Sequence, residues 1–205
     1  MEGGLVRKLA LLTLCVAFAL PGVAWADPSN NPDFNFSRTF EFDPTNTGCP
    51  EAQWQNREGR ADTPGGSTFG LLLAKNCPST TVASAGAVAN SIRGTSATTV
   101  GFDLRNDSPC TGGSPRFNLL TEQGTFHFVG GCGNDNESQP TADPDWTRYR
   151  FELNDPGETF PVVPPGATIA QLVLIADEEG NYRLDNIAVD ELCAQKPGQS
   201  RACTP

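Results

Sequence analysis

Hydrophobic and polar residues alternate in many short stretches of this chain, and the clearest pattern begins at residue 100. Successive side chains of a β-strand point to opposite faces of its sheet. One face of residues 100–105 carries the apolar side chains Val100, Phe102 and Leu104. The opposite face carries Asp103 and Arg105. The pattern therefore predicts a strand with one face in a hydrophobic core.

A β-hairpin is predicted over residues 116–129, with a four-residue loop at Thr121-Glu122-Gln123-Gly124. Gly124 suits the positive φ that closes a type I turn. In this register Leu119 lies opposite Phe126, and Asn118 lies opposite His127. One face is then apolar, with Phe117, Leu119, Phe126 and Phe128. The other face collects Arg116, Asn118 and His127, and burial of the apolar face should fix the register.

The rest of the chain reads as further short strands separated by turns. We expect them at residues 34–42, 68–75, 82–92, 96–105, 146–153, 169–176 and 182–189. Phe40 and Phe42 are expected to point inward, and a bulge is expected near Asp185-Asn186 because the apolar parity changes there. Long loops are expected at residues 43–66 and 130–145, and a Pro/Gly-rich segment at 154–166. With no helical period sustained for three turns, the pattern predicts an all-β antiparallel sandwich.

The first 26 residues have the pattern of a signal peptide. Arg7 and Lys8 precede an apolar run over residues 9–20, and Ala24-Trp25-Ala26 has the small-x-small pattern of a cleavage site. The run is shorter than the roughly 20 residues of a membrane span, so we expect cleavage after Ala26 and no span in the mature chain. The expected organisation is a signal peptide at 1–26, a loose leader at 27–33, a sandwich domain at 34–190 and a disulfide-closed tail at 191–205.

Six cysteines remain after the predicted cleavage site. They are Cys49, Cys77, Cys110, Cys132, Cys193 and Cys203. An even number in an exported chain indicates three disulfides, although six cysteines allow 15 pairings. We predict the sequential pairing, best supported for Cys110–Cys132 because the hairpin brings its flanks together. No CxxC or HxxxH spacing supports the alternative of a zinc site.

The chain is acidic, which limits its partners. Its formal net charge is −10, and cleavage after Ala26 would remove Glu2, Arg7 and Lys8 and leave −11. Such a chain repels phosphate backbones and anionic membrane surfaces, so we expect no nucleic acid partner.

The last quarter of the chain carries a resemblance. The segment LVLIADEEGNYRLDNIAVD, with its motif Leu184-Asp185-Asn186-Ile187-Ala188-Val189, resembles the end of exported jelly-roll β-sandwiches related to carbohydrate-binding modules. The segment GFDLRND…PRFNLLTEQGTFHFVGGCG is similar to uncharacterised secreted bacterial proteins. The resemblance implies a jelly roll with a concave face, sugar binding, and a structural Ca²⁺ held by Asp185 with Glu41 or Asp43. The chain departs from a typical sugar binder because it has no clear run of exposed Trp or Tyr.

The candidate ligand-binding residues are Arg116, Asn118 and His127, extended by Asp103 if its strand lies alongside, together with Trp146 at a strand end. Their side chains can hydrogen-bond hydroxyls and carboxylates or, for Trp146, stack on a ring. The alternative is a solvated sheet face with an Asp103–Arg116 ion pair. With no GxSxG, no HExxH and one histidine, we expect no catalytic residues. The predicted function is non-catalytic binding, with carbohydrate or glycan as the ligand; the alternatives are a structural or protein-interaction role in the cell envelope, and glycoside hydrolysis.

Overall fold

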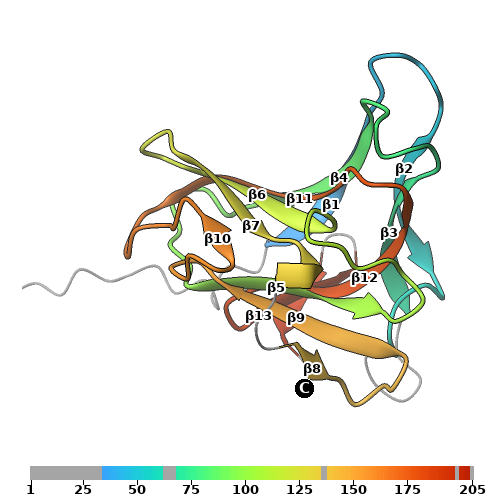
Figure 1. The fold of residues 1–205 in the computed structure, drawn as a ribbon. Helices are drawn as coiled ribbons and strands as arrows, with labels where there is room; N and C mark the ends of the chain where they lie inside the picture. The colour runs from blue at the N-terminus through green and yellow to red at the C-terminus, as the bar shows by residue number, and fades with distance from the viewer. Residues whose placement is uncertain (1–33, 62–67, 135–137, 197–198, 204–205) are drawn as a thin grey trace, which may run out of the picture.

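A computed structural model describes residues 34–61, 68–134, 138–196 and 199–203 of this chain. The predicted signal peptide and leader, residues 1–33, lie outside these ranges. The described residues form two antiparallel β-sheets that pack face to face (Figure 1). The prediction of an all-β antiparallel sandwich is therefore confirmed.

Sheet A is the upper layer in Figure 1 and has six strands. In spatial order they are β1 (Asn35–Phe42), β4 (Ser84–Asn90), β11 (Ile169–Ala176), β6 (Arg116–Thr121), β7 (Phe126–Gly130) and β10 (Thr159–Phe160). The strongly apolar β11 lies inside the sheet, between β4 and β6. Both of its edges are hydrogen-bonded, which suits a strand with few polar side chains.

Sheet B is the lower layer. Its path is β14 (Gln199–Ala202), β13 (Leu192–Lys196), β12 (Gly180–Val189), β5 (Thr99–Arg105), β9 (Trp146–Glu152) and β8 (Gln139–Pro140). Two further strands, β3 (Phe69–Lys75) and β2 (Pro50–Asn56), extend it, because β3 pairs with the first half of β12 and β2 with β3. A short 3₁₀ turn, Cys132–Asn134, follows β7.

The core lies between the sheets and is built by strand alternation. Val100, Phe102 and Leu104 are buried as predicted. The ring of Phe102 packs on Phe117 of sheet A, with centroids 5.9 Å apart, and on Phe151 of its own sheet at 5.7 Å. These rings join the two layers, and aromatic pairs at such distances add to the stability that their burial provides.

Two local predictions of this part of the chain were wrong. Phe40 and Phe42 do not point inward, because an irregularity between Asn35 and Arg38 changes the parity of β1; Phe36 is buried and Phe42 is half exposed. The expected loop at 43–66 contains β2, whose sequence is mostly polar and shows weak alternation. The Cys193–Cys203 disulfide closes the expected tail, and residues 192–196 and 199–202 form a β-hairpin of sheet B, since β13 pairs with β12 and with β14.

Other local predictions are confirmed. The pairing of β12 with β5 is interrupted after Asp185, and Asn186 has a φ of 44°, which is the expected bulge. The cysteines pair sequentially, as Cys49–Cys77, Cys110–Cys132 and Cys193–Cys203. Three disulfides are typical of proteins that fold in an oxidising compartment. Within the described ranges, no helix has the length and apolarity needed to cross a membrane.

Candidate functional site

The β6–β7 hairpin has a register one residue away from the predicted one. Asn118 lies opposite Phe128, and Leu119 lies opposite His127. The Thr121 amide donates to the Thr125 carbonyl, so the loop has three residues, with Gly124 at a φ of 83°. A three-residue loop of this kind is a type I turn followed by a residue in the left-handed region.

This shift reverses every side chain of β7, because the side-chain period of a strand is two. His127, predicted on the polar face, is 1% exposed and shares the inner face with Leu119. Its Nδ1–H donates to the Pro161 carbonyl at 2.6 Å, and its Nε2 is buried without a hydrogen bond to any described residue. The phenylalanines predicted for the core, Phe126 and Phe128, are instead exposed on the outer face, at 44% and 48%.

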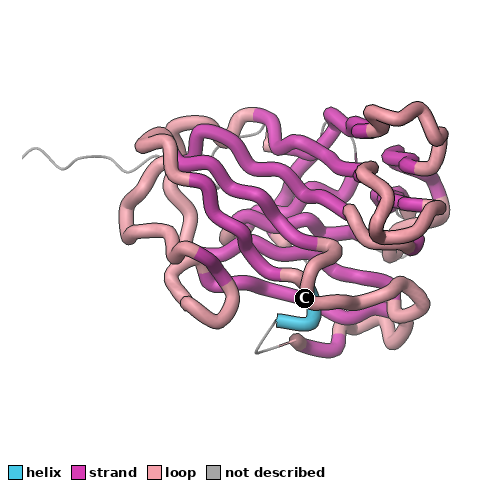
Figure 2. The backbone as a smooth tube through the Cα atoms, turned by 45° about the horizontal axis from the view of Figure 1, so that its top comes forward, coloured by secondary structure: helices cyan, strands magenta, loops and turns pink. Residues whose placement is uncertain are grey.

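The new register aligns one outward residue from each strand of sheet A. This cross-strand row consists of Phe160, Phe128, Asn118, Val173, Val88 and Arg38, in order from β10 to β1. No described element covers the outer side of sheet A, as the backbone view shows (Figure 2). The row is thus a continuous strip of surface that crosses the whole sheet.

Exposed aromatic rings occupy one end of the cross-strand row. Phe160 is 75% exposed, and it lies directly opposite Phe128. The rings of Phe126 and Phe128 meet edge to face with centroids 5.0 Å apart. Val162, two residues after the end of β10, is also exposed, at 40%. A contiguous exposed apolar patch of this kind marks an interaction site more often than isolated exposed residues do.

Arg116 joins polar groups to this aromatic patch. Its guanidinium makes two hydrogen bonds to the carboxylate of Asp177, at 2.6 and 2.7 Å, and a third to the Gly113 carbonyl. The same guanidinium lies over the Phe128 ring, 5.7 Å from its centroid. The bidentate pair holds the guanidinium plane in one orientation, so ring, cation and carboxylate form a rigid unit.

Two hollows flank the cross-strand row. The first, of about 280 Å³, is lined by Arg116, Phe128, Asn134, Glu158 and Phe160, among others. The second, of about 450 Å³, lies towards β1 and is lined by Arg38, Val88, Arg93, Leu120 and Gln171, among others. Between them, the Oδ1 atom of Asn118 is buried and makes no hydrogen bond to any described residue. The row therefore combines apolar rings, fixed polar groups and concave surface, the usual constituents of a ligand site.

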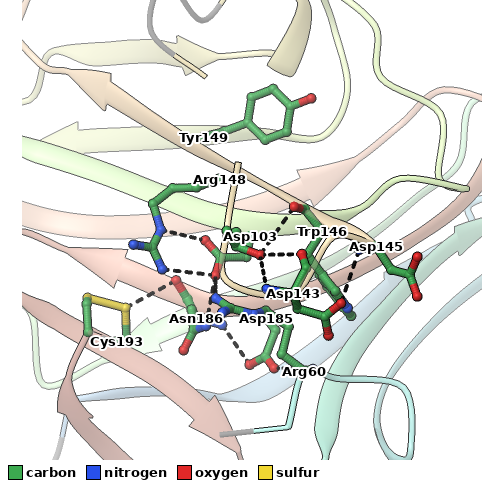
Figure 3. Close-up of polar contacts among 12 residues, drawn as sticks. Arg60, Asp103, Asp143, Asp145, Trp146, Arg148, Tyr149, Asp185, Asn186 and Cys193 are labelled. Atoms are coloured by element: carbon green, nitrogen blue, oxygen red, sulfur yellow. Dashed lines mark hydrogen bonds and ion pairs between the residues drawn. A yellow bond between two sulfur atoms is a disulfide. The ribbon is translucent and has the colours of Figure 1, made fainter. Parts of the chain in front are cut away.

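A second polar cluster lies on the outer face of sheet B, around Asp103 (Figure 3). Asp103 is fully buried and accepts hydrogen bonds from Arg60, Arg148 and Asn186, at 3.0 Å for Arg148 Nε and 2.8 Å for Asn186 Nδ2. Arg150 adds an ion pair at 3.7 Å. These donors already surround the carboxylate. We therefore interpret the cluster as a structural anchor, which holds the segment that carries Arg60 in place.

The five predicted ligand-binding residues are therefore divided among three places. Arg116 and Asn118 share the outer face of sheet A, and His127 lies in its interior. Asp103 belongs to sheet B, so the predicted Asp103–Arg116 ion pair does not form, and Arg116 pairs with Asp177 instead. Trp146 begins β9 near Asp103 and is 4% exposed, which leaves little of its ring for a ligand (Figure 3).

Each of the predicted calcium ligands has hydrogen-bond partners within the protein. Both carboxylate oxygens of Asp185 accept backbone N–H groups, from Arg60 and from Asn186, each at 2.7 Å. Asp43 accepts from Gly48 and from Thr47, and its hydrogen bond from the Thr47 backbone holds its pKa below the ordinary value. Glu41 accepts from the Ala52 amide. Among the described residues, no group of three or more His, Cys, Asp or Glu side chains is arranged to hold a metal ion.

The residues of the candidate site that the sequence pattern did not predict are the exposed phenylalanines. Phe126 and Phe128 alternate with polar residues as core residues do, so only the loop length distinguishes the two faces. Phe160 stands in a Pro/Gly-rich segment without any periodicity. The available signal was Gly124, which fits a three-residue loop as well as a four-residue one.

Comparisons with known proteins identify no family whose binding sites could be compared with this one. The chain matches no protein family model, no curated protein and no solved structure. The site must therefore be interpreted from its own geometry.

Proposed function

We propose that this protein is an exported, non-catalytic binding module and that the outer face of sheet A binds carbohydrate. The observation that carries the proposal is the cross-strand row, where the exposed rings of Phe128 and Phe160 adjoin the Arg116–Asp177 pair and the Asn118 amide. The three disulfides and the signal-like N-terminal sequence support export.

The chemistry of a sugar suits this arrangement. One face of a pyranose ring is largely apolar and can lie against an aromatic ring, while the hydroxyls at its edge need donors and acceptors. Phe128 and Phe160 supply the apolar contact. Arg116, Asp177 and Asn118 supply planar polar groups at the edge of these rings, and their bonds to one another limit the entropy lost on binding.

The test is a glycan array probed with the mature protein, followed by calorimetry on the glycans that bind, with and without EDTA. A Phe128→Ala/Phe160→Ala double variant should lose binding, because both exposed rings are removed. Phe42→Ala is the matched control, since Phe42 is 50% exposed on β1 but lies outside the row. Failure of the folded protein to bind any glycan would overturn the proposal.

A protein-interaction role is the second candidate, and one observation favours it. Phe160 and Val162 are both strongly exposed beside the short edge strand β10, where an extended partner segment could lie. An absence of glycan binding, together with capture of a defined envelope protein that depends on Phe160, would favour this candidate over carbohydrate.

A further inference from the structure

The cross-strand row has two chemically different ends. Phe160 is at the β10 end, and Arg38 is at the β1 end. Five strand-to-strand steps of about 4.8 Å separate them, or about 24 Å in all. A ligand that contacts both ends must therefore be an extended molecule, such as an oligosaccharide, rather than a single sugar.

The cation at the β1 end is available for a ligand. The Arg38 side chain is exposed and makes no ion pair or hydrogen bond with any described residue. It lines the hollow of about 450 Å³ together with Arg93. Arg93 is also open to solvent, with a side chain that is 80% exposed and a single contact to Glu122 at 3.5 Å.

The arginine beside the aromatic rings is already paired. Arg116 and Asp177 neutralise each other through two short hydrogen bonds. Arg38, without an ion pair to any described residue, and the weakly paired Arg93 therefore differ from Arg116, in a chain whose formal net charge is −10. An exposed arginine that a carboxylate has not neutralised is a ready partner for an anionic group, which it binds through two parallel N–H donors.

From this asymmetry we propose that the ligand is an anionic carbohydrate, bearing carboxylate or sulfate groups. Its sugar rings lie against Phe128 and Phe160, and an acidic group lies in the hollow beside Arg38. The inference rests on the proposed carbohydrate-binding function and specifies the chemical class of the ligand. Because the protein as a whole repels anions, the local attraction at Arg38 must act at short range.

The experiment measures binding of the mature protein to polygalacturonate oligosaccharides and to the same oligosaccharides after chemical reduction of their carboxyl groups. The two probes share backbone linkages and differ in charge. A sulfated glycosaminoglycan fragment forms a third arm and distinguishes sulfate from carboxylate. The expected result is at least about tenfold tighter binding to one anionic probe than to the neutral probe, with the advantage falling as salt is raised.

Two variants locate the effect. Arg38→Gln should weaken binding of the anionic probe about fivefold to tenfold more than it weakens binding of the neutral probe. Arg57→Gln is the matched control, because it makes the same change in net charge in the turn after β2, on the sheet B side. Binding should remain at the level of the unmodified protein in this control.

The outcomes separate the two proposals. In one outcome the neutral and anionic probes bind equally well, Phe128→Ala/Phe160→Ala abolishes this binding, and Arg38→Gln does not change it. That outcome would overturn the anionic ligand and support carbohydrate binding. Equal losses in Arg38→Gln and Arg57→Gln would assign the charge dependence to net charge and would also overturn the inference. If neither these probes nor any glycan on the array binds, both proposals fail.

Discussion

Asn118 of β6 lies directly opposite Phe128 of β7, on the outer face of sheet A. This pairing places an amide beside an exposed aromatic ring and places His127 in the interior, opposite Leu119. The composition of both faces of the hairpin depends on this one register. It can be tested by measuring stability, before any ligand is known.

The register predicts a large loss of stability when one phenylalanine of the hairpin is replaced by alanine and a small loss when another is. Phe117→Ala should lower the free energy of unfolding by about 3–5 kcal/mol, because Phe117 is fully buried and its removal leaves a cavity. Phe128→Ala should cost about 1 kcal/mol or less, since it removes an exposed ring and its contact with Arg116. Denaturant unfolding of both variants checks this, and a cost of several kcal/mol for Phe128→Ala would contradict the register.

The loop that sets the register depends on Gly124. Its φ of 83° lies in the left-handed region, which costs a residue with a Cβ about 1–2 kcal/mol. Gly124→Ala should therefore destabilise the protein by about that amount, and Gly124→Asn by less. A Cβ at Gly124 would meet nothing within 4 Å, so the effect isolates backbone conformation.

Gly112→Ala is the control for this loop variant. Gly112 is not among the residues with positive φ, and its Cβ would make an ordinary contact of 3.5 Å with Asn134. The change should leave stability within about 1 kcal/mol of the original. If Gly112→Ala and Gly124→Ala behave alike in thermal unfolding, the positive φ is not what makes Gly124 necessary.

The sequence predicted those parts of the fold that follow from alternation over a whole strand. The bulge after Asp185 followed from a break in this alternation. The inward set of β5 and the strand at β11 follow from the alternation itself. In each of them a run of apolar side chains has the same spacing as the core face of a strand. The pairing Cys110–Cys132 likewise followed from the two flanks of one hairpin.

The candidate site was less predictable because it depends on single-residue choices. A loop of three rather than four residues moved Phe128 outward and His127 inward. An irregularity in β1 before Arg38 exchanged the inner and outer faces for the rest of the strand, which placed the Arg38 side chain on the outer face. Local composition does not specify these choices, since each register offers one apolar face. The packing of sheet A on sheet B decides between them.

The Asp103 cluster gives a prediction for sheet B. Asp103→Asn should destabilise the protein by about 3–5 kcal/mol, because it removes a buried anion from arginines that surround it. Asp107→Asn is the control: its side chain is 60% exposed, and its ion pair with Arg105 should contribute less than about 1 kcal/mol. Chemical denaturation of both variants checks this, and equal small losses would refute the role of Asp103 as an anchor.

Tyr182 gives a prediction about alkaline pH. Its burial raises the pKa of the phenol above the ordinary value of 10.0. A hydrogen bond from Ser114 lowers this pKa, and the nearby carboxylates of Glu178 and Asp177 raise it. The net effect is a raised pKa. As pH rises, the unfolded chain therefore loses this proton before the folded protein does. The stability that this difference represents is present below about pH 10 and is lost as pH rises through the pKa of the folded state.

The measurement uses the small number of tyrosines in the chain, which are Tyr149 and Tyr182. A Tyr149→Phe variant leaves Tyr182 as the single source of tyrosinate absorbance, so its titration midpoint in the folded protein should lie above 10.0. Tyr182→Phe should in turn reduce the loss of stability above about pH 10, at the cost of the hydrogen bond to the Glu178 carbonyl. A midpoint at or below the ordinary value in the folded Tyr149→Phe variant would contradict the burial of Tyr182.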